Sequence, residues 1–178
     1  MINIENLKEF AQPYYAKKDI MHNLCHIGRI LKSVEKLLEH GEYNVDMEIV
    51  TCAAYFHGFI YNSEKDIVEW LKTQEVAEDK ISKIINAAWE AQKDKVPVTL
   101  EGKVLHDAYM TEGEKTYLVV KSLIIGCSKK QTLEETIKYM EDNVLDKGSC
   151  YLPEAQEFYI EQQNYAKEFV HNLRDGLK

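Results

Sequence analysis

The stretch from about Asn23 to His40 constrains this chain most, because its apolar residues recur every three and four positions. Such spacing places them along one side of an α-helix, and that side must be buried against other elements. Gly41 follows directly and is a residue that commonly ends a helix. The segment is therefore predicted to be a long amphipathic helix within a folded core. Its apolar positions are Leu24, Ile27, Ile30, Leu31, Val34, Leu37 and Leu38.

Helical spacing continues along almost the whole chain. Pro13 is expected to end the first helix early, because proline lacks the N–H that an inner turn needs. Residues 116–125 are rich in β-branched side chains, but the helical surroundings favour a helix there as well. A turn is expected at residues 58–63. One predicted helix, which Asn44 or Asp46 can cap, runs through Ile49 and Phe56 toward His57. The other predicted helices cover residues 4–15, 64–74, 79–91, 101–110, 132–146 and 153–173.

These segments define one class of fold. No βαβ series, internal repeat or linker divides the chain, and 178 residues are enough for one domain with a real core. The prediction is an all-α protein, a compact multi-helix bundle forming a single domain over residues 1–178.

The composition excludes several functions. A formal net charge of −8 argues against binding a nucleic-acid polymer, which requires a basic surface. No apolar run approaches the roughly 20 residues that span a bilayer, and the first residues do not resemble a signal peptide. We therefore expect a cytoplasmic protein that makes no membrane contact, and homo-oligomer formation stays open.

Two histidines at the start of the long helix are the first chemical signal. His22 and His26 are four residues apart, and Arg29 follows three residues later, so all three share one side of a helix. Neutral imidazole is a common metal ligand, and arginine suits a phosphate oxygen. Two later stretches, around His57 and Asp107, carry related chemistry. A metal shared by His26, His57 and Asp107 would satisfy three side chains that are each adjacent to buried positions.

Several motifs in this order resemble the HD-domain superfamily of metal-dependent phosphohydrolases. Residues 21–27 (M-H-N-L-C-H-I) are similar to the Y-H-N-x-x-H-I form of one bacterial branch, and residues 26–30 (H-I-G-R-I) to its H-x-x-R-hydrophobic motif. Residues 53–61 (A-A-Y-F-H-G-F-I-Y) resemble A-A-W-F-H-D-x-V-Y, and residues 62–65 (N-S-E-K) resemble N-E-E-K. Residues 105–108 (L-H-D-A) look like the final L-x-D-A motif, so the resemblance covers nearly the whole chain.

The resemblance implies a metal site and a reaction. His26, His57 and Asp107 would hold a divalent ion (Mn, Fe, Ni, Zn or Mg), as two imidazoles and one carboxylate with open positions. The metal would activate water to hydrolyse a small phosphate ester, with nucleotides among the candidate substrates. The alternative for each histidine is a hydrogen-bonded core residue, and for Asp107 a helix cap.

Phosphate contacts are assigned to three further residues. Arg29, His22 and Lys65 are the candidates, since their side chains can donate to phosphate oxygens. Arg29 equally suits a structural ion pair, His22 a supporting role and Lys65 a solvated surface. Tyr61 and Tyr109 are candidates to line the pocket.

Departures from the family pattern support a second function. Gly58 stands where the family has the Asp of its His-Asp pair, and Tyr109 stands where the branch has another Asp. The alternative is therefore an HD-fold protein that has lost catalysis and binds a ligand or partner. If Gly58 alone accounts for the lost carboxylate, Gly58→Asp is expected to raise metal affinity. His106 is expected at the surface or at the end of a helix.

Overall fold

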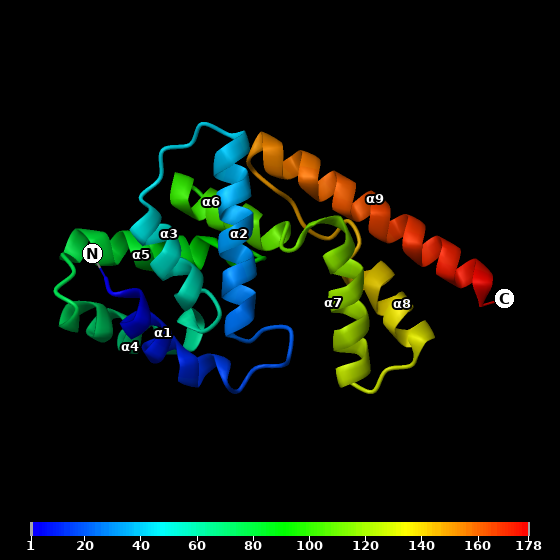
Figure 1. Cartoon of the computed structure of the whole chain (residues 1–178), viewed down its shortest axis with the longest axis horizontal. Helices are drawn as coiled ribbons and strands as arrows, with labels where there is room; N and C mark the ends of the chain where they lie inside the picture. The colour runs from blue at the N-terminus through cyan, green and yellow to red at the C-terminus, as the bar shows by residue number, and fades with distance from the viewer. Residues whose placement is uncertain (1, 178) are drawn as a thin grey trace.

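The computed structural model describes residues 2–177, which form nine α-helices and no strand (Figure 1). The all-α prediction is confirmed, and residues 116–125 are helical. The helices are α1 (Ile4–Tyr15), α2 (Leu24–His40), α3 (Met47–Phe56), α4 (Ile60–Thr73), α5 (Glu78–Glu90), α6 (Leu100–Met110), α7 (Glu114–Ser128), α8 (Leu133–Asn143) and α9 (Pro153–Gly176).

Side chains named by the sequence pattern cap several helices. Asn23 begins α2, where its side chain accepts a hydrogen bond from the backbone N–H of Cys25. Asp46, rather than Asn44, caps α3. Thr132 opens α8 in a reciprocal capping box. These caps satisfy N–H groups that the first helical turn leaves without partners, so they fix where each helix begins.

The predicted helix over residues 4–15 is confirmed as α1, and Pro13 lies inside it without ending it early. The missing N–H leaves only the carbonyl of Glu9 without its helical partner, and Glu9 is exposed to water. The expected turn at residues 58–63 is shorter, because α4 already begins at Ile60 and bends at Ser63, whose φ and ψ are −137° and 24°.

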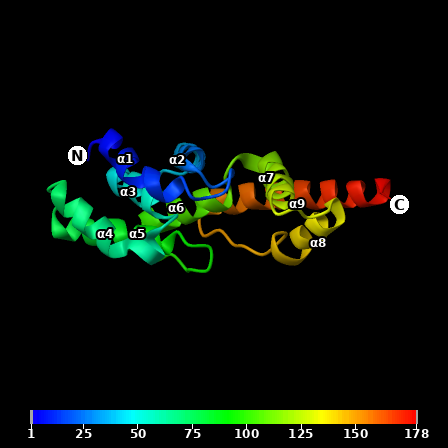
Figure 2. The same ribbon diagram turned by 90° about the horizontal axis from the view of Figure 1, so that it is seen from below.

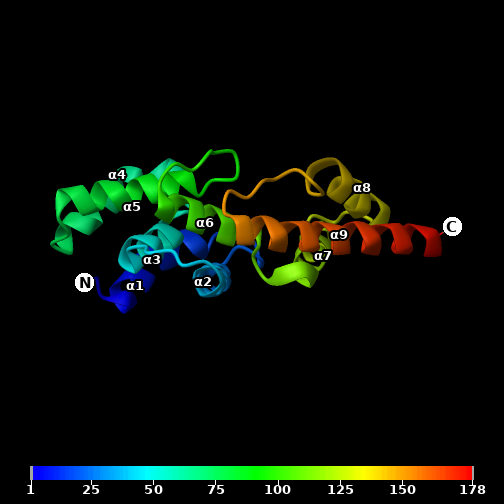
Figure 3. The same ribbon diagram turned by 90° about the horizontal axis from the view of Figure 1, so that it is seen from above.

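The apolar side chains form two clusters along the long axis of the molecule. The larger one joins α1 to α6 with the start of α9, and includes the fully buried Ile27, Phe56 and Leu105. The smaller one joins α7, α8 and the later part of α9, through Val119 and Ile137 among others. Figures 2 and 3 show α9 running from the first group of helices to the second. None of the helices described has the length and apolarity needed to cross a membrane.

Candidate functional site

A cavity of about 470 Å³ opens where distant segments meet at the edge of the larger cluster. The loop between α1 and α2, the junction of α3 with α4, the α5–α6 loop and the loop before α9 all contribute to its wall. It therefore depends on the tertiary fold. Its lining residues are Tyr15, Lys18, His22, His26, His57, Gly58, Tyr61, Gln92, Lys93, Asp94, Tyr109 and Lys147.

His26 reaches the cavity from the first turn of α2. Its side chain is 2 % exposed, and its Nδ1 lies 2.8 Å from Oε1 of Glu112. Burial lowers the pKa of His26, although hydrogen bonding and attraction to Glu112 oppose that change. The neutral ring therefore donates its Nδ1–H to the carboxylate, and Nε2 keeps the free lone pair.

His57 follows α3 directly and lies beside His26, with 6.3 Å between the ring centroids. Burial lowers the pKa of His57 to about 3, and the nearby charges of Lys18 and Lys121 act in the same direction. The amide nitrogen of Gln92 lies 3.2 Å from His57 Nδ1. The same nitrogen donates to the carbonyls of His57 (2.9 Å) and Ala88 (3.0 Å), and these two bonds use both of its N–H groups. His57 is therefore a neutral ring with one N–H and one lone pair.

Tyr109 is the α6 residue that faces both histidines. Its ring centroid lies 4.8 Å from that of His57 and 5.9 Å from that of His26. Burial raises the pKa of Tyr109, followed by the negative charge of Glu112, so its phenol stays protonated at neutral pH. The interpretation of Tyr61 and Tyr109 as pocket residues is confirmed.

Asp107 is placed elsewhere. It is fully buried, and its Oδ2 accepts hydrogen bonds from the backbone N–H groups of Tyr151 (2.8 Å) and Leu152 (2.7 Å), just before α9. Its Oδ1 lies 3.0 Å from Nδ1 of His106, which is 1 % exposed, so the surface expectation for His106 is wrong. The structure does not bring Asp107 together with His26 and His57, and its carboxylate instead holds α9 to α6.

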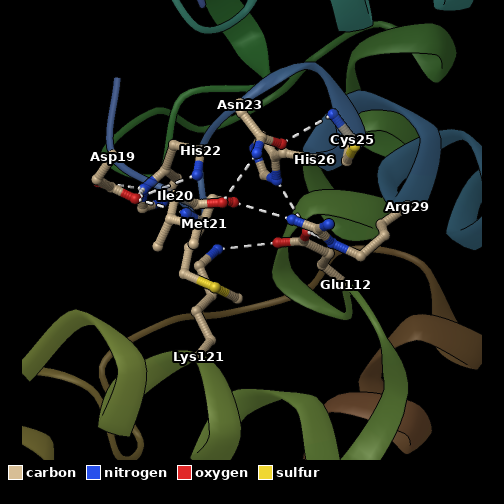
Figure 4. Close-up of polar contacts among 10 residues, drawn as sticks. All are labelled: Asp19, Ile20, Met21, His22, Asn23, Cys25, His26, Arg29, Glu112 and Lys121. Carbon is tan, nitrogen blue, oxygen red and sulfur yellow. Dashed lines mark hydrogen bonds and ion pairs between the residues drawn. The ribbon is translucent and has the colours of Figure 1, made fainter. Parts of the chain in front are cut away.

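Arg29 joins a buried charge cluster around Glu112 (Figure 4). Its Nε donates to the same Glu112 Oε1 that His26 contacts, at 2.7 Å, and Lys121 Nζ lies 2.9 Å from Oε2. Burial alone would raise the pKa of Glu112, but the hydrogen bond from His26 and attraction to Lys121 hold it at about 2. Arg29 lines a second cavity and not the one that contains the histidines.

The other two residues predicted to contact phosphate lie in different places. His22 lines the cavity, and its Nδ1 lies 2.8 Å from Oδ2 of Asp19 (Figure 4). Lys65 is exposed on α4 and does not line the cavity. Of the predicted set, the structure brings together His22, His26 and His57.

Gly58 is packed against a tyrosine of α1. A Cβ at position 58 would lie 2.6 Å from the Tyr15 hydroxyl, closer than carbon and oxygen approach without a shift. Tyr15 is 2 % exposed, and its hydroxyl donates to the carbonyl of Tyr55 at 2.9 Å. The space that an aspartate side chain would need at this position is therefore occupied, which removes the simple expectation for Gly58→Asp.

A matched pair of glycine variants tests this packing. Gly58→Ala is expected to destabilise the protein by about 1–3 kcal/mol, the usual cost of overpacking. Gly28→Ala, whose Cβ would meet nothing within 4 Å, is expected to stabilise α2 by roughly 0.5–1 kcal/mol. Urea unfolding of both variants measures this difference. Gly58→Asp should likewise gain no Ni²⁺ affinity by calorimetry, and tighter Ni²⁺ binding would contradict the contact described.

The donor groups at the cavity do not fit a divalent metal ion. Over residues 2–177, no three His, Cys, Asp or Glu side chains are grouped so that they could hold one. His26 and His57 each offer one lone pair, and both Glu112 oxygens already accept from cationic or ring N–H groups.

Three lysines at the cavity were missed by the sequence analysis. Lys18, Lys93 and Lys147 line it, and in the described part of the chain none of them forms an ion pair with a carboxylate. Asp94 is the acidic residue in the lining. The lysines lie in loops whose paths a helical pattern does not reveal, and the one sequence signal was that Lys18 precedes His22 by four residues. The cavity is thus locally positive in an acidic protein.

Comparison with solved structures establishes the fold. Bacillus subtilis YpgQ in complex with ADP matches with a TM-score of 0.76 and 17% identity, over 98% of this chain and 97% of that one. An HD-superfamily hydrolase from Bacillus thuringiensis matches with a TM-score of 0.75 and 17% identity, over 98% and 96%. The Lin1889 protein of Listeria innocua matches with a TM-score of 0.71 and 21% identity, over 99% and 98%.

The chain therefore has the fold of the HD-domain superfamily, as its motifs suggested. No protein-family model and no curated protein matches its sequence. At these identities the likeness extends to the fold, and the chemistry must be argued from the side chains of this chain.

Proposed function

We propose that this protein binds a small phosphorylated molecule, such as a nucleotide, in the cavity beside His26 and His57, through its own side chains. The observation that carries the proposal is the group of three lysines around that cavity, none of which forms an ion pair within residues 2–177. Ammonium groups attract phosphate strongly where few carboxylates compete. The cavity volume of about 470 Å³ is in the range that small ligands occupy.

The likeness to YpgQ supports the ligand class. That protein was crystallised in complex with ADP, and it shares this fold over nearly the full length of both chains. The neutral rings of His57 and Tyr109 and the exposed ring of Tyr61 add hydrogen-bond donors and flat apolar surface to the lysines. A nucleotide offers its phosphates to the lysines and its base to the aromatic rings.

Metal-dependent hydrolysis of a phosphate ester is the second candidate. The fold shared with an HD-superfamily hydrolase favours it. Against it stand the absent carboxylate at Gly58 and the placement of Asp107. We therefore rank ligand binding first.

Calorimetry with ADP separates the two candidates. We expect the full chain to bind ADP equally well in EDTA and in Mn²⁺, because lysines and histidines supply the contacts. Phosphate release, followed in the same samples, is expected to stay at the level of buffer alone. Release that requires Mn²⁺ would establish the hydrolase, and no binding of ADP or pyrophosphate under either condition would overturn the first proposal.

A further inference from the structure

Tyr15 and Lys18 act on the same residue at the inner wall of the cavity. The Tyr15 hydroxyl accepts a hydrogen bond from the backbone N–H of Gly58 at 3.2 Å. Lys18 Nζ donates to the carbonyl of the same residue at 2.5 Å. Both side chains come from the end of α1 and the loop after it. They bracket the position at which the family motif carries an aspartate.

Lys18 is better positioned than Lys93 and Lys147 to contact a ligand in the cavity. It is half-buried, whereas Lys93 and Lys147 are exposed at the rim. Its ammonium is held by the Gly58 carbonyl and lies 5.7 Å from the centre of the Tyr15 ring. An ammonium has three N–H groups, so two remain for a ligand after the bond to Gly58. Less conformational entropy is lost on binding when the donor is already fixed.

We infer that Lys18 is the group that contacts the ligand's phosphate, and that it supplies the positive charge in place of a metal ion. Its ammonium is held by the carbonyl of Gly58, and Tyr15 holds the backbone N–H of the same residue. This inference depends on the function proposed above, and it names Lys18 as the main contact with the bound phosphate. Replacing a metal ion by an ammonium is chemically consistent, because an aspartate at position 58 would attract a cation. Glycine instead leaves room for the Tyr15 phenol, and its carbonyl accepts a hydrogen bond from Lys18. A bound metal ion and the Lys18 ammonium would repel each other.

The test compares neighbouring lysines by calorimetry with ADP and with inorganic pyrophosphate, both in EDTA. Lys18→Met is expected to lower the affinity for both ligands by about tenfold or more, the loss typical of one charge-assisted hydrogen bond. Lys18→Arg keeps the charge and should retain most of the affinity. Lys17→Met removes the same charge from an exposed neighbour outside the cavity and should bind like wild type. Circular dichroism melts establish that each variant is folded.

The outcomes separate this inference from the proposed function. If wild type binds neither ligand in EDTA or in Mn²⁺, the proposed function fails. If wild type binds and Lys18→Met binds equally well, the inference is wrong and the proposed function stands. Equal losses in Lys17→Met and Lys18→Met would also overturn it, because the effect would then come from net charge. If wild type binds in Mn²⁺ but not in EDTA, the claim that Lys18 supplies the positive charge in place of a metal ion is wrong.

Discussion

Glu112→Ala is expected to lower the free energy of unfolding by about 3–5 kcal/mol, the range found when one partner of a buried ion pair is removed. Glu112 is 3 % exposed and accepts hydrogen bonds from His26, Arg29 and Lys121. Truncation leaves two cations and a ring N–H without their acceptor inside the fold. Urea unfolding followed by circular dichroism measures the loss.

The neighbouring glutamate is the control for this prediction. Glu114 pairs with Lys36, but both side chains are largely exposed, at 69% and 36%. Glu114→Ala should therefore cost at most about 1 kcal/mol. Adding Lys121→Met to Glu112→Ala should recover part of the stability, since it removes a stranded ammonium. Equal effects of the two single variants would contradict the role assigned to the buried cluster.

The fold was accessible from the sequence because burial in a helical protein is periodic. The residues of α2 predicted to face inward include Ile27, Ile30 and Val34, which are fully buried. The start of α4 at Ile60 could not be predicted in this way. Gly58 resembled a turn residue, but its lack of a side chain is what allows close contact with Tyr15, a residue 43 positions away.

The site was only partly accessible for a related reason. His26 and His57 were expected in one place, and they line one cavity. On α6, however, Asp107 and Tyr109 are two residues apart, so their side chains point about 160° apart around the helix axis and face different neighbours. The motif pattern selected Asp107, whereas the fold turns Tyr109 toward the histidines. Glu112 is 86 residues from His26 in the chain, and no local pattern connects them.

Asp107 provides the sharpest distinction between a metal ligand and a structural anchor. As an anchor, its carboxylate is needed whether or not metal is present, because two backbone N–H groups before α9 depend on it. As a ligand, it would matter for metal affinity and little for the stability of the metal-free protein. The two roles therefore predict different results from one variant studied in EDTA.

Asp107→Ala is expected to destabilise the protein in EDTA by about 3 kcal/mol or more, because it leaves buried donors without a charged acceptor. Asp107→Asn keeps an acceptor oxygen and should lose less. Asp142→Ala, which removes an exposed partner of Lys138, should change stability by at most about 0.5 kcal/mol. Urea unfolding gives these values, and Ni²⁺ calorimetry on the same proteins should show no difference between wild type and Asp107→Ala. Unchanged stability with lost Ni²⁺ binding would return Asp107 to the role of metal ligand.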